Sequence, residues 1–222
     1  MVKARANLIA AVLATALLGS VAAQAADRPQ NGWYVLSQDL KAWQEPTGQW
    51  FTAGGAQIDP KNRRRLVGEP VALEFMIPEN SNSGVKLEGV YEVQIFDSWK
   101  VAKPKGEDCG GIYPRAELTP TYHHIDDGIA PLKNAAKQPG RWQTLEIVFR
   151  APRFDAHGGK IASARFDKVV LNGILIHDHV EVRYPTGHIW RQRETARGPL
   201  LLQADHGPVA FRNVRVRPLP AK

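Results

Sequence analysis

The sequence predicts an all-β protein, an antiparallel β-sandwich of the jelly-roll kind. Three observations support this fold class. Short apolar runs recur between turn residues, the dipeptide Asn172-Gly173 between two such runs is a strong hairpin signal, and no apolar stripe with a 3.6-residue period exceeds a few turns. Glycine (19) and proline (16) in a chain of 222 residues also favour short strands joined by many turns.

The strands are expected in the following order. Residues 26–57, rich in aromatic and polar residues, supply a first strand or two, and Val71–Ile77 alternates so that its odd-numbered residues share one apolar face. Pro78 ends that strand, and the run Asn80–Gly84 is typical of a turn. Val90–Phe96 is the next strand, with Tyr91, Val93 and Ile95 on one face and Glu92, Gln94 and Phe96 on the other. Further strands are expected at Thr144–Arg150, Ala164–Asn172, Ile174–Val182, Leu200–Gln203 and Val209–Arg217.

Residues 99–140 separate two groups of these strands. They contain many prolines and glycines and few periodic apolar positions. We expect a long ordered loop region, a feature that is uncommon in compact domains unless the loops serve a site.

The first 25 residues have the three parts of a secretory signal. Lys3 and Arg5 supply a positive start, residues 8–18 are apolar but short for a bilayer span, and Ala23-Gln24-Ala25 is a small-residue cleavage site. We therefore expect a bacterial protein that is periplasmic or secreted, with no membrane segment after cleavage. The absence of a composition break predicts a single domain at residues 26–222.

Charge and cysteine content exclude several classes. The net charge of +7 is scattered, and Arg63–Arg65 is the only tight basic run, so the sequence does not support nucleic-acid binding. The single cysteine, Cys109, excludes an internal disulfide and a multi-cysteine zinc site. We expect it to be a small, partly buried residue rather than a nucleophile.

The polar face of the Val90–Phe96 strand is the first candidate site. Glu92, Gln94 and Phe96 combine a carboxylate, an amide and a ring, as sugar-binding clefts do, because hydroxyls require donors and acceptors and a pyranose stacks on a ring. The alternative is an ordinary solvated outer face. Only the first of the three alternate positions is acidic, which argues against a retaining two-carboxylate glycosidase on this strand.

The second candidate lies near the C-terminus. Asp205 and His206 leave a strand just before Gly207-Pro208, and Arg212 lies in the next strand. Strict alternation would place Arg212 on the face of Val214 and Val216, away from a site, unless a bulge intervenes. The alternative is a turn in which Asp205 and His206 cap backbone groups.

Two histidine groups have the composition of metal sites. His177, His179 and Glu181 would project to one side of a strand. His123-His124 and Asp126-Asp127 lie in the long loop. Surface exposure is the alternative for the first group, and the second has little specificity.

An ordered set of short motifs resembles one family. The motifs are Asn82-Ser83-Gly84, Tyr91–Ser98, Gly110–Tyr113, Gly140–Gln143, Leu171–Gly173, Leu202–Gly207 and Phe211–Asn213. Together, from about Gly32 to Leu219, they are similar to the 3-keto-disaccharide hydrolase domain family. The resemblance implies a concanavalin A-like jelly roll, of the lectin and glucanase type, that cleaves glycosides oxidised at C3. Some relatives read Leu-Gln-Asp-His-Gly, so Ala204 is an extra residue expected to shift Asp205 and His206 by one position.

The implied chemistry requires one base, because a 3-keto group acidifies the C2 proton and permits elimination of the C1 substituent, followed by hydration. On this hypothesis Glu92 is the base or a metal-holding carboxylate, and His206 and Arg212 polarise the keto oxygen or carry the proton. The expected substrate-positioning residues are Asn82, Gln94, Asp97, Tyr113 and Gln203. The available oxygen and imidazole ligands would accept a divalent metal ion, but no spacing requires one. The alternatives are a non-catalytic carbohydrate-binding protein, which cleft tryptophans would favour, and an interaction domain without a site.

Overall fold

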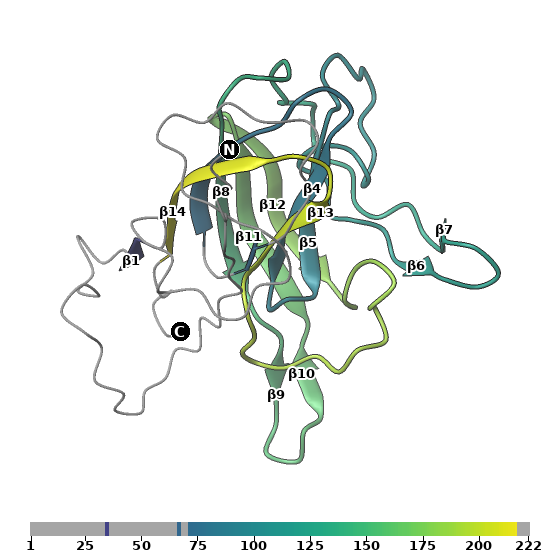
Figure 1. Ribbon diagram of the computed structural model, residues 1–222. Coiled ribbons are helices and arrows are strands. Elements are labelled where there is room, and N and C mark those ends of the chain that lie inside the picture. Colours follow the sequence, from purple (N-terminus) through teal and green to yellow (C-terminus); the bar gives the residue numbers. More distant parts are fainter. Residues whose placement is uncertain (1–33, 36–65, 68–70, 217–222) are drawn as a thin grey trace, which may run out of the picture.

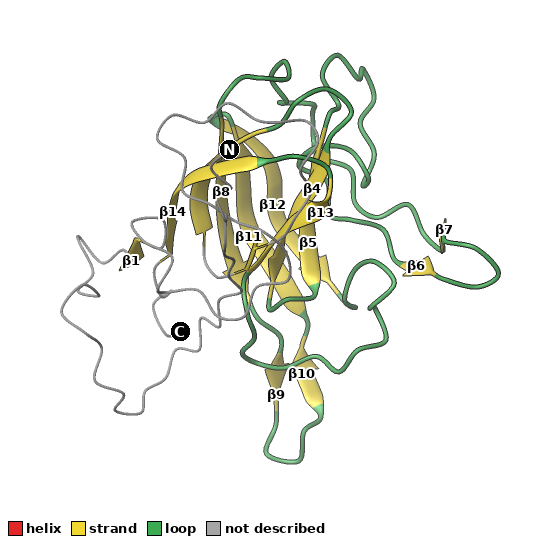
Figure 2. Ribbon diagram, in the orientation of Figure 1, coloured by secondary structure: helices red, strands yellow, loops and turns green. Residues whose placement is uncertain are grey.

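A computed structural model describes residues 34–35, 66–67 and 71–216, and this part of the chain is built from strands and loops without a helix (Figures 1 and 2). No helix that could span a membrane is therefore present in the described residues. The expected leader, the run Arg63–Arg65 and all of the aromatic segment 26–57 except Tyr34–Val35 lie outside them. The strands are β1 (Tyr34–Val35), β2 (Leu66–Val67), β3 (Val71–Met76), β4 (Asn82–Leu87), β5 (Tyr91–Phe96), β6 (Ala116–Glu117), β7 (His123–His124), β8 (Gln143–Arg150), β9 (Arg153–Phe154), β10 (Lys160–Ala162), β11 (Ala164–Leu171), β12 (Ile174–Val182), β13 (Leu201–His206) and β14 (Ala210–Val216).

Two antiparallel sheets pack face to face, which confirms the predicted sandwich. One sheet has six strands in the order β1-β14-β3-β8-β11-β12, and the other has four in the order β2-β13-β4-β5. Several neighbours in both sheets, such as β14 and β3 or β13 and β4, come from distant parts of the chain, as expected for a jelly roll. The small ribbons β6–β7 and β9–β10 extend away from the sandwich (Figure 1).

The core lies between the sheets and is built by the alternation seen in the sequence. Leu73, Phe75 and Ile77 face it from one sheet, and Tyr91, Val93 and Ile95 face it from the other. All six are at most 3% exposed, so their apolar surface is removed from water almost completely. Because successive strand residues point to opposite faces, Glu92 and Gln94 must lie on the outer face of the four-stranded sheet.

The hairpin predicted at Asn172-Gly173 is confirmed. Asn172 and Gly173 have φ angles of 53° and 78°, the left-handed conformation that a two-residue hairpin of this type demands at both central positions. The turn joins β11 to β12, with Leu171 paired to Ile174.

The prediction that Asn80–Gly84 forms a turn is wrong beyond its first residues. Only Glu79 and Asn80 form the turn, and Asn82 begins β4, which hydrogen-bonds to β5 on one side and β13 on the other. Asparagine, serine and glycine disfavour strands locally, but a central strand position bonded on both edges outweighs that preference.

The expectation that His177, His179 and Glu181 share one face is also wrong. His179 has a φ of 53°, which kinks β12, and the pairing with β11 shifts register between Val169 and Val170. As a result His177 is buried, with Nε2 2.7 Å from the Gly110 carbonyl oxygen, whereas His179 and Glu181 are exposed. Burial lowers the pKa of His177, as desolvation disfavours the imidazolium.

Candidate active site

The candidate site is the outer face of the four-stranded sheet, where a loop segment extends the sheet beyond β5. Residues 110–113 run antiparallel to β5, with Gly111 accepting a hydrogen bond from the Gln94 amide at 2.8 Å and Tyr113 donating one to the Glu92 carbonyl at 3.0 Å. Ile112 pairs with Val93 between them and is buried in the core. Tyr113 therefore stands directly opposite Glu92 on the outer face.

Strand registers arrange the polar residues of this face in rows. Lys86 of β4 is paired with Glu92 of β5, so the first row reads Lys86, Glu92, Tyr113. The second row reads Gln203, Gly84, Gln94, because Gly84 pairs with both neighbours. The third row places His206 of β13 opposite Asn82 of β4. Residues that are far apart in sequence are thus brought together by sheet pairing.

Glu92 is buried beside a cation. Its Oε2 lies 2.9 Å from Lys86 Nζ, and the two side chains are only 4% and 9% exposed. A buried charge requires such a partner, because removing an unpaired ion from water costs roughly several kcal/mol. The alternative of a solvated outer face is therefore wrong for this part of the strand.

Gly84 makes room for the Glu92 carboxylate. A Cβ at position 84 would lie 2.1 Å from Glu92 Oε1, far inside contact distance. The carboxylate consequently lies over the backbone of β4. A glycine inside a strand often marks such a close approach.

Amide groups flank this carboxylate. The Gln94 side chain donates to Asn82 Oδ1 at 3.2 Å, and both Gln94 and Gln203 are buried. An amide offers donors and an acceptor together, which suits sugar hydroxyls because each hydroxyl both donates and accepts.

A bulge in β13 absorbs the extra residue Ala204. Gln203 pairs with Gly84 and His206 with Asn82, so three steps along β13 match two steps along β4. Gln203 and His206 therefore lie on the same face, and the expected displacement of His206 by one position does not occur. His206 Nδ1 lies 3.0 Å from the Gln203 amide and 2.6 Å from Asp205 Oδ1. Both Asp205 and His206 are exposed at the rim of the face.

Tyr113 is the start of a second polar cluster. Its hydroxyl lies 3.1 Å from His124 Nε2 and 3.1 Å from the Tyr122 hydroxyl. On the other side of the imidazole, His124 Nδ1 lies 3.4 Å from Glu107 Oε2. Burial, helped by the hydrogen bond with Tyr122 and the nearby Glu92 carboxylate, raises the pKa of Tyr113 well above its usual range.

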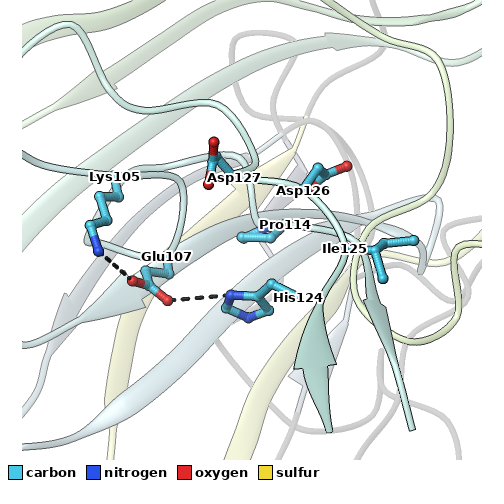
Figure 3. A pocket seen from close by; sticks show the side chains of 7 residues that line it. All are labelled: Lys105, Glu107, Pro114, His124, Ile125, Asp126 and Asp127. Atoms are coloured by element: carbon cyan, nitrogen blue, oxygen red, sulfur yellow. Dashed lines mark hydrogen bonds and ion pairs between the residues drawn. The ribbon is translucent and has the colours of Figure 1, made fainter. Parts of the chain in front are cut away.

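A polar hollow of about 520 Å³ adjoins this cluster. It is lined by Lys105, Glu107, Pro114, His124, Ile125, Asp126 and Asp127. Figure 3 shows Glu107 between Lys105 and His124, with an ion pair to each. Hydrogen bonds from Arg115 and two backbone amides outweigh burial and lower the pKa of Asp126, so this wall of the hollow carries a carboxylate.

Two predicted site residues do not join the group. Arg212 lies in β14 of the six-stranded sheet, where its Nη2 donates to Glu74 Oε2 at 2.6 Å and its guanidinium stands 3.9 Å from the Trp142 ring centre. A bulge at Asn213 (φ 52°) does turn Arg212 away from buried Val214, but onto the outer face of the wrong sheet. Asp97 directly follows β5 and accepts a hydrogen bond from the Asn80 backbone amide at 3.0 Å, so it holds the turn before β4.

Three residues of the site are not predicted from the sequence, or are only weakly indicated by it. Lys86 follows residues that carry a turn signal, so no strand is predicted there, although alternation from Asn82 through Gly84 places it on the site face. Tyr122 carries no sequence signal. His124 was noted only as half of a weak histidine pair.

The remaining reactive residues do not form a site of their own. Cys109 is buried, and desolvation raises the pKa of its thiol to about 12, which agrees with the expected inert role. Among the described residues no group of three or more histidine, cysteine, aspartate or glutamate side chains could hold a metal ion.

The fold and the site define a jelly-roll protein with a carboxylate- and amide-rich sheet face, the class to which many carbohydrate-binding and carbohydrate-cleaving proteins belong. The chain belongs to the 3-keto-alpha-glucoside-1,2-lyase-like domain family, whose model matches residues 32–217. This match confirms the resemblance drawn from the motifs and supports an enzyme that acts on glycosides.

A solved structure shows the same fold. A Parabacteroides distasonis protein provisionally named as a glycosyl hydrolase is 24% identical, with 85% of this chain and 84% of that chain covered and a TM-score of 0.60. A second protein of that organism with the same provisional name is 15% identical over 87% of this chain and 92% of that one, with a TM-score of 0.47. No curated protein matches the sequence significantly.

Proposed function

We propose that this protein cleaves 3-keto-glycosides by removing the C2 proton, eliminating the C1 substituent and adding water to the product. The observation that carries this proposal is the pairing on the site face. A buried carboxylate, Glu92, stands between an ammonium, Lys86, and a phenol, Tyr113, with amides in the adjacent row.

The chemistry suits one carboxylate rather than two. The C3 ketone delocalises the electron pair left at C2, forming an enolate, and its collapse makes the C1–C2 double bond while the C1–O bond breaks. The departing oxygen takes up a proton. Water then adds at C1 and a proton returns to C2, which yields the free 3-keto sugar. The family description, a 1,2-lyase-like domain, agrees with elimination between C1 and C2.

Within this scheme Glu92 is the base. Lys86 Nζ, 2.9 Å from that carboxylate, supplies positive charge next to the place where the enolate develops. Asn82, Gln94 and Gln203 would hold the sugar hydroxyls. His206, at the rim of the face, would bind the keto oxygen. Arg212 and Asp97 have no part in this scheme, because the first lies on the other sheet and the second holds a turn.

Two observations weigh against the alternatives. A direct glycosidase would place two carboxylates at a set separation across the bond to be broken, and the rows of β13, β4 and β5 described above contain one carboxylate, Glu92. A lectin that stacks sugars on tryptophan would present an open ring. The described tryptophans each have a cation over the ring: Lys100 at Trp99, Arg212 at Trp142, and Arg115 and Arg191 at Trp190.

The test is turnover of both anomers of 4-nitrophenyl 3-keto-glucoside and of their unoxidised parents. Wild-type protein should release nitrophenol from a keto substrate only. Glu92→Gln should lose turnover by about 10³-fold or more while its unfolding midpoint stays within a few degrees. Glu74→Gln is the matched control, because Glu74 is a partly buried glutamate paired to Arg212 on the other sheet.

Three results would contradict the proposal. Release from the unoxidised parents would indicate an ordinary glycosidase. Retention of sugar without release would indicate a binding protein. Unchanged turnover in Glu92→Gln would remove Glu92 from the reaction.

A further inference from the structure

The first step of the argument is the position of the Tyr113 hydroxyl. Tyr113 is the residue directly across from Glu92 in the extended sheet, so the two side chains leave the sheet on the same face. A substrate whose C2 proton meets Glu92 would therefore have its neighbouring C1 substituent close to a second polar group. Tyr113 is that group.

The second step is the connection behind Tyr113. The Tyr113 hydroxyl, the His124 imidazole and the Glu107 carboxylate form a chain, with separations of 3.1 Å and 3.4 Å. The Glu107 carboxylate lies beside Nδ1, and Nε2 is the ring nitrogen that contacts the phenol, so a proton exchanged with Tyr113 passes through Nε2. This order of carboxylate, imidazole and hydroxyl is the arrangement by which proteins drive proton transfer through a hydroxyl.

The third step is access to water. His124 and Glu107 both line the 520 Å³ hollow, together with exposed Lys105 and Asp127 (Figure 3). The outer end of the chain can therefore exchange protons with solvent, and the rings of Tyr113 and Tyr122 each make an edge-to-face contact with His124. The chain joins the buried face to bulk water.

We propose that Tyr113 is the proton donor to the departing C1 oxygen and that His124, held by Glu107, resupplies its proton. This role rests on the proposed function. The phenol starts each cycle protonated, because burial raises its pKa. Tyr113 is thus a catalytic residue, whereas His124 and Glu107 act through it.

The proton count of the cycle closes. In the elimination Glu92 gains the C2 proton, Tyr113 gives its proton to the leaving oxygen, and His124 passes one to Tyr113. In the hydration the attacking water loses a proton through Tyr113 to His124, and Glu92 returns its proton to C2. Glu92, Tyr113 and His124 then have their starting protons, and no oxidant or other reactant is consumed.

The experiment compares two 3-keto-glucosides that differ in how far the leaving oxygen depends on protonation. Nitrophenolate leaves without help, whereas an alkoxide requires a proton. With the full chain, Tyr113→Phe should lose about 10²–10⁴-fold in kcat/KM on methyl 3-keto-glucoside but no more than roughly tenfold on the 4-nitrophenyl substrate. His124→Gln and Glu107→Gln should show the same selective loss, smaller in size.

Two neighbours serve as controls. Tyr122→Phe removes a hydroxyl that also touches Tyr113 but lies outside the chain, and His123→Gln changes the adjacent exposed histidine, whose Nδ1 contacts the Thr121 carbonyl. Any loss in these variants should be equal on both substrates. If Tyr113→Phe does not fold, as judged by its unfolding midpoint, His124→Gln provides the same comparison at a half-buried position.

The outcomes separate the two proposals. Wild-type turnover with an equal loss on both substrates in Tyr113→Phe and His124→Gln overturns the proton-donor role and leaves the proposed function standing. Wild-type protein that cleaves neither keto substrate overturns the proposed function itself. A loss confined to the alkyl substrate supports the chain from Glu107 to Tyr113.

Discussion

Gly84 allows a direct test of the site geometry, because it is the residue on which the Glu92 carboxylate lies. An added Cβ would meet only Glu92 atoms as its three nearest neighbours, at 2.1 Å from Oε1, 2.9 Å from Cδ and 3.1 Å from Cγ. Gly84→Ala therefore acts on one side chain. The strand conformation itself does not oppose the alanine, since the φ of Gly84 lies outside the left-handed region.

The size of the effect follows from these distances. To reach ordinary contact of about 3.5 Å, the carboxylate must move by roughly 1.4 Å. A displacement of about 1 Å at a reacting group can lower the rate by about 10²-fold. Overpacking costs about 1–3 kcal/mol, and replacing glycine in the unfolded chain returns about 0.4–1 kcal/mol, so a net loss of up to ~2.5 kcal/mol is expected.

The assay is a double-mutant cycle that combines Gly84→Ala with Glu92→Ala and measures the stability of each variant by thermal unfolding. Turnover is measured for the Gly84→Ala single variant. In the Glu92→Ala background the obstructing atoms are gone, and Gly84→Ala should become neutral or stabilising. The two measurements should differ by about 1–3 kcal/mol, which corresponds to roughly 2–12 °C in Tm for a domain of this size. The reasoning is refuted if Gly84→Ala retains full turnover and its effect on Tm is the same in both backgrounds.

Two further predictions concern Arg212, which lies outside the site, and His206, which a bulge keeps on the site face. Arg212→Met should leave turnover unchanged and cost about 0.5–2 kcal/mol at pH 7, since it removes the ion pair with Glu74 and the cation over Trp142. The hydrogen bond from Arg212 lowers the pKa of Glu74 below its usual value of 4.5. The stabilisation from the Arg212–Glu74 pair is therefore fully present above pH 4.5 and is lost as the pH falls through the folded-state pKa. An equal Tm difference between Arg212→Met and wild type at pH 7 and at pH 3 would contradict this reasoning. Deleting Ala204 should remove the bulge and keep His206 beside Gln203, because two steps along a regular strand return to the same face. Turnover should then stay within about tenfold, whereas inserting a second alanine after Ala204 should move His206 off the face and lower turnover further; the reverse order of activities would contradict the assigned register.

The parts of the fold that the sequence predicted are those in which local pattern and tertiary environment agree. β5 and β12 were placed almost to the residue, since alternating or continuous apolar runs have one stable arrangement when a sheet is covered on one face. The Asn172-Gly173 turn was predictable because its positive φ angles are a local requirement. β4 was missed because Asn82, Ser83 and Gly84 carry a turn signal, and only pairing to two neighbouring strands overrides it.

The candidate site divides in the same way. Glu92 and Gln94 share a face by alternation alone, and the family motifs pointed to Asn82, Tyr113, Gln203 and His206. Their burial, however, depends on what covers the face, and alternation carries no such information. The bulges at Ala204 and Asn213 decide which way His206 and Arg212 point, and a bulge is set by the partner strand rather than by the bulged residues themselves.

The sequence by itself determined the strand periodicity, the hairpin, the inert single cysteine and the presence of one acidic position on the β5 face, because each of these is a property of neighbouring residues. Tertiary structure alone decided that Lys86 would pair with Glu92, that Gly84 would make room for that carboxylate, and that Tyr113 would join Glu92 to His124 and Glu107. The physical reason is that these contacts are made across strands, and the register that creates them is selected by burial of the opposite, apolar face of the same sheet.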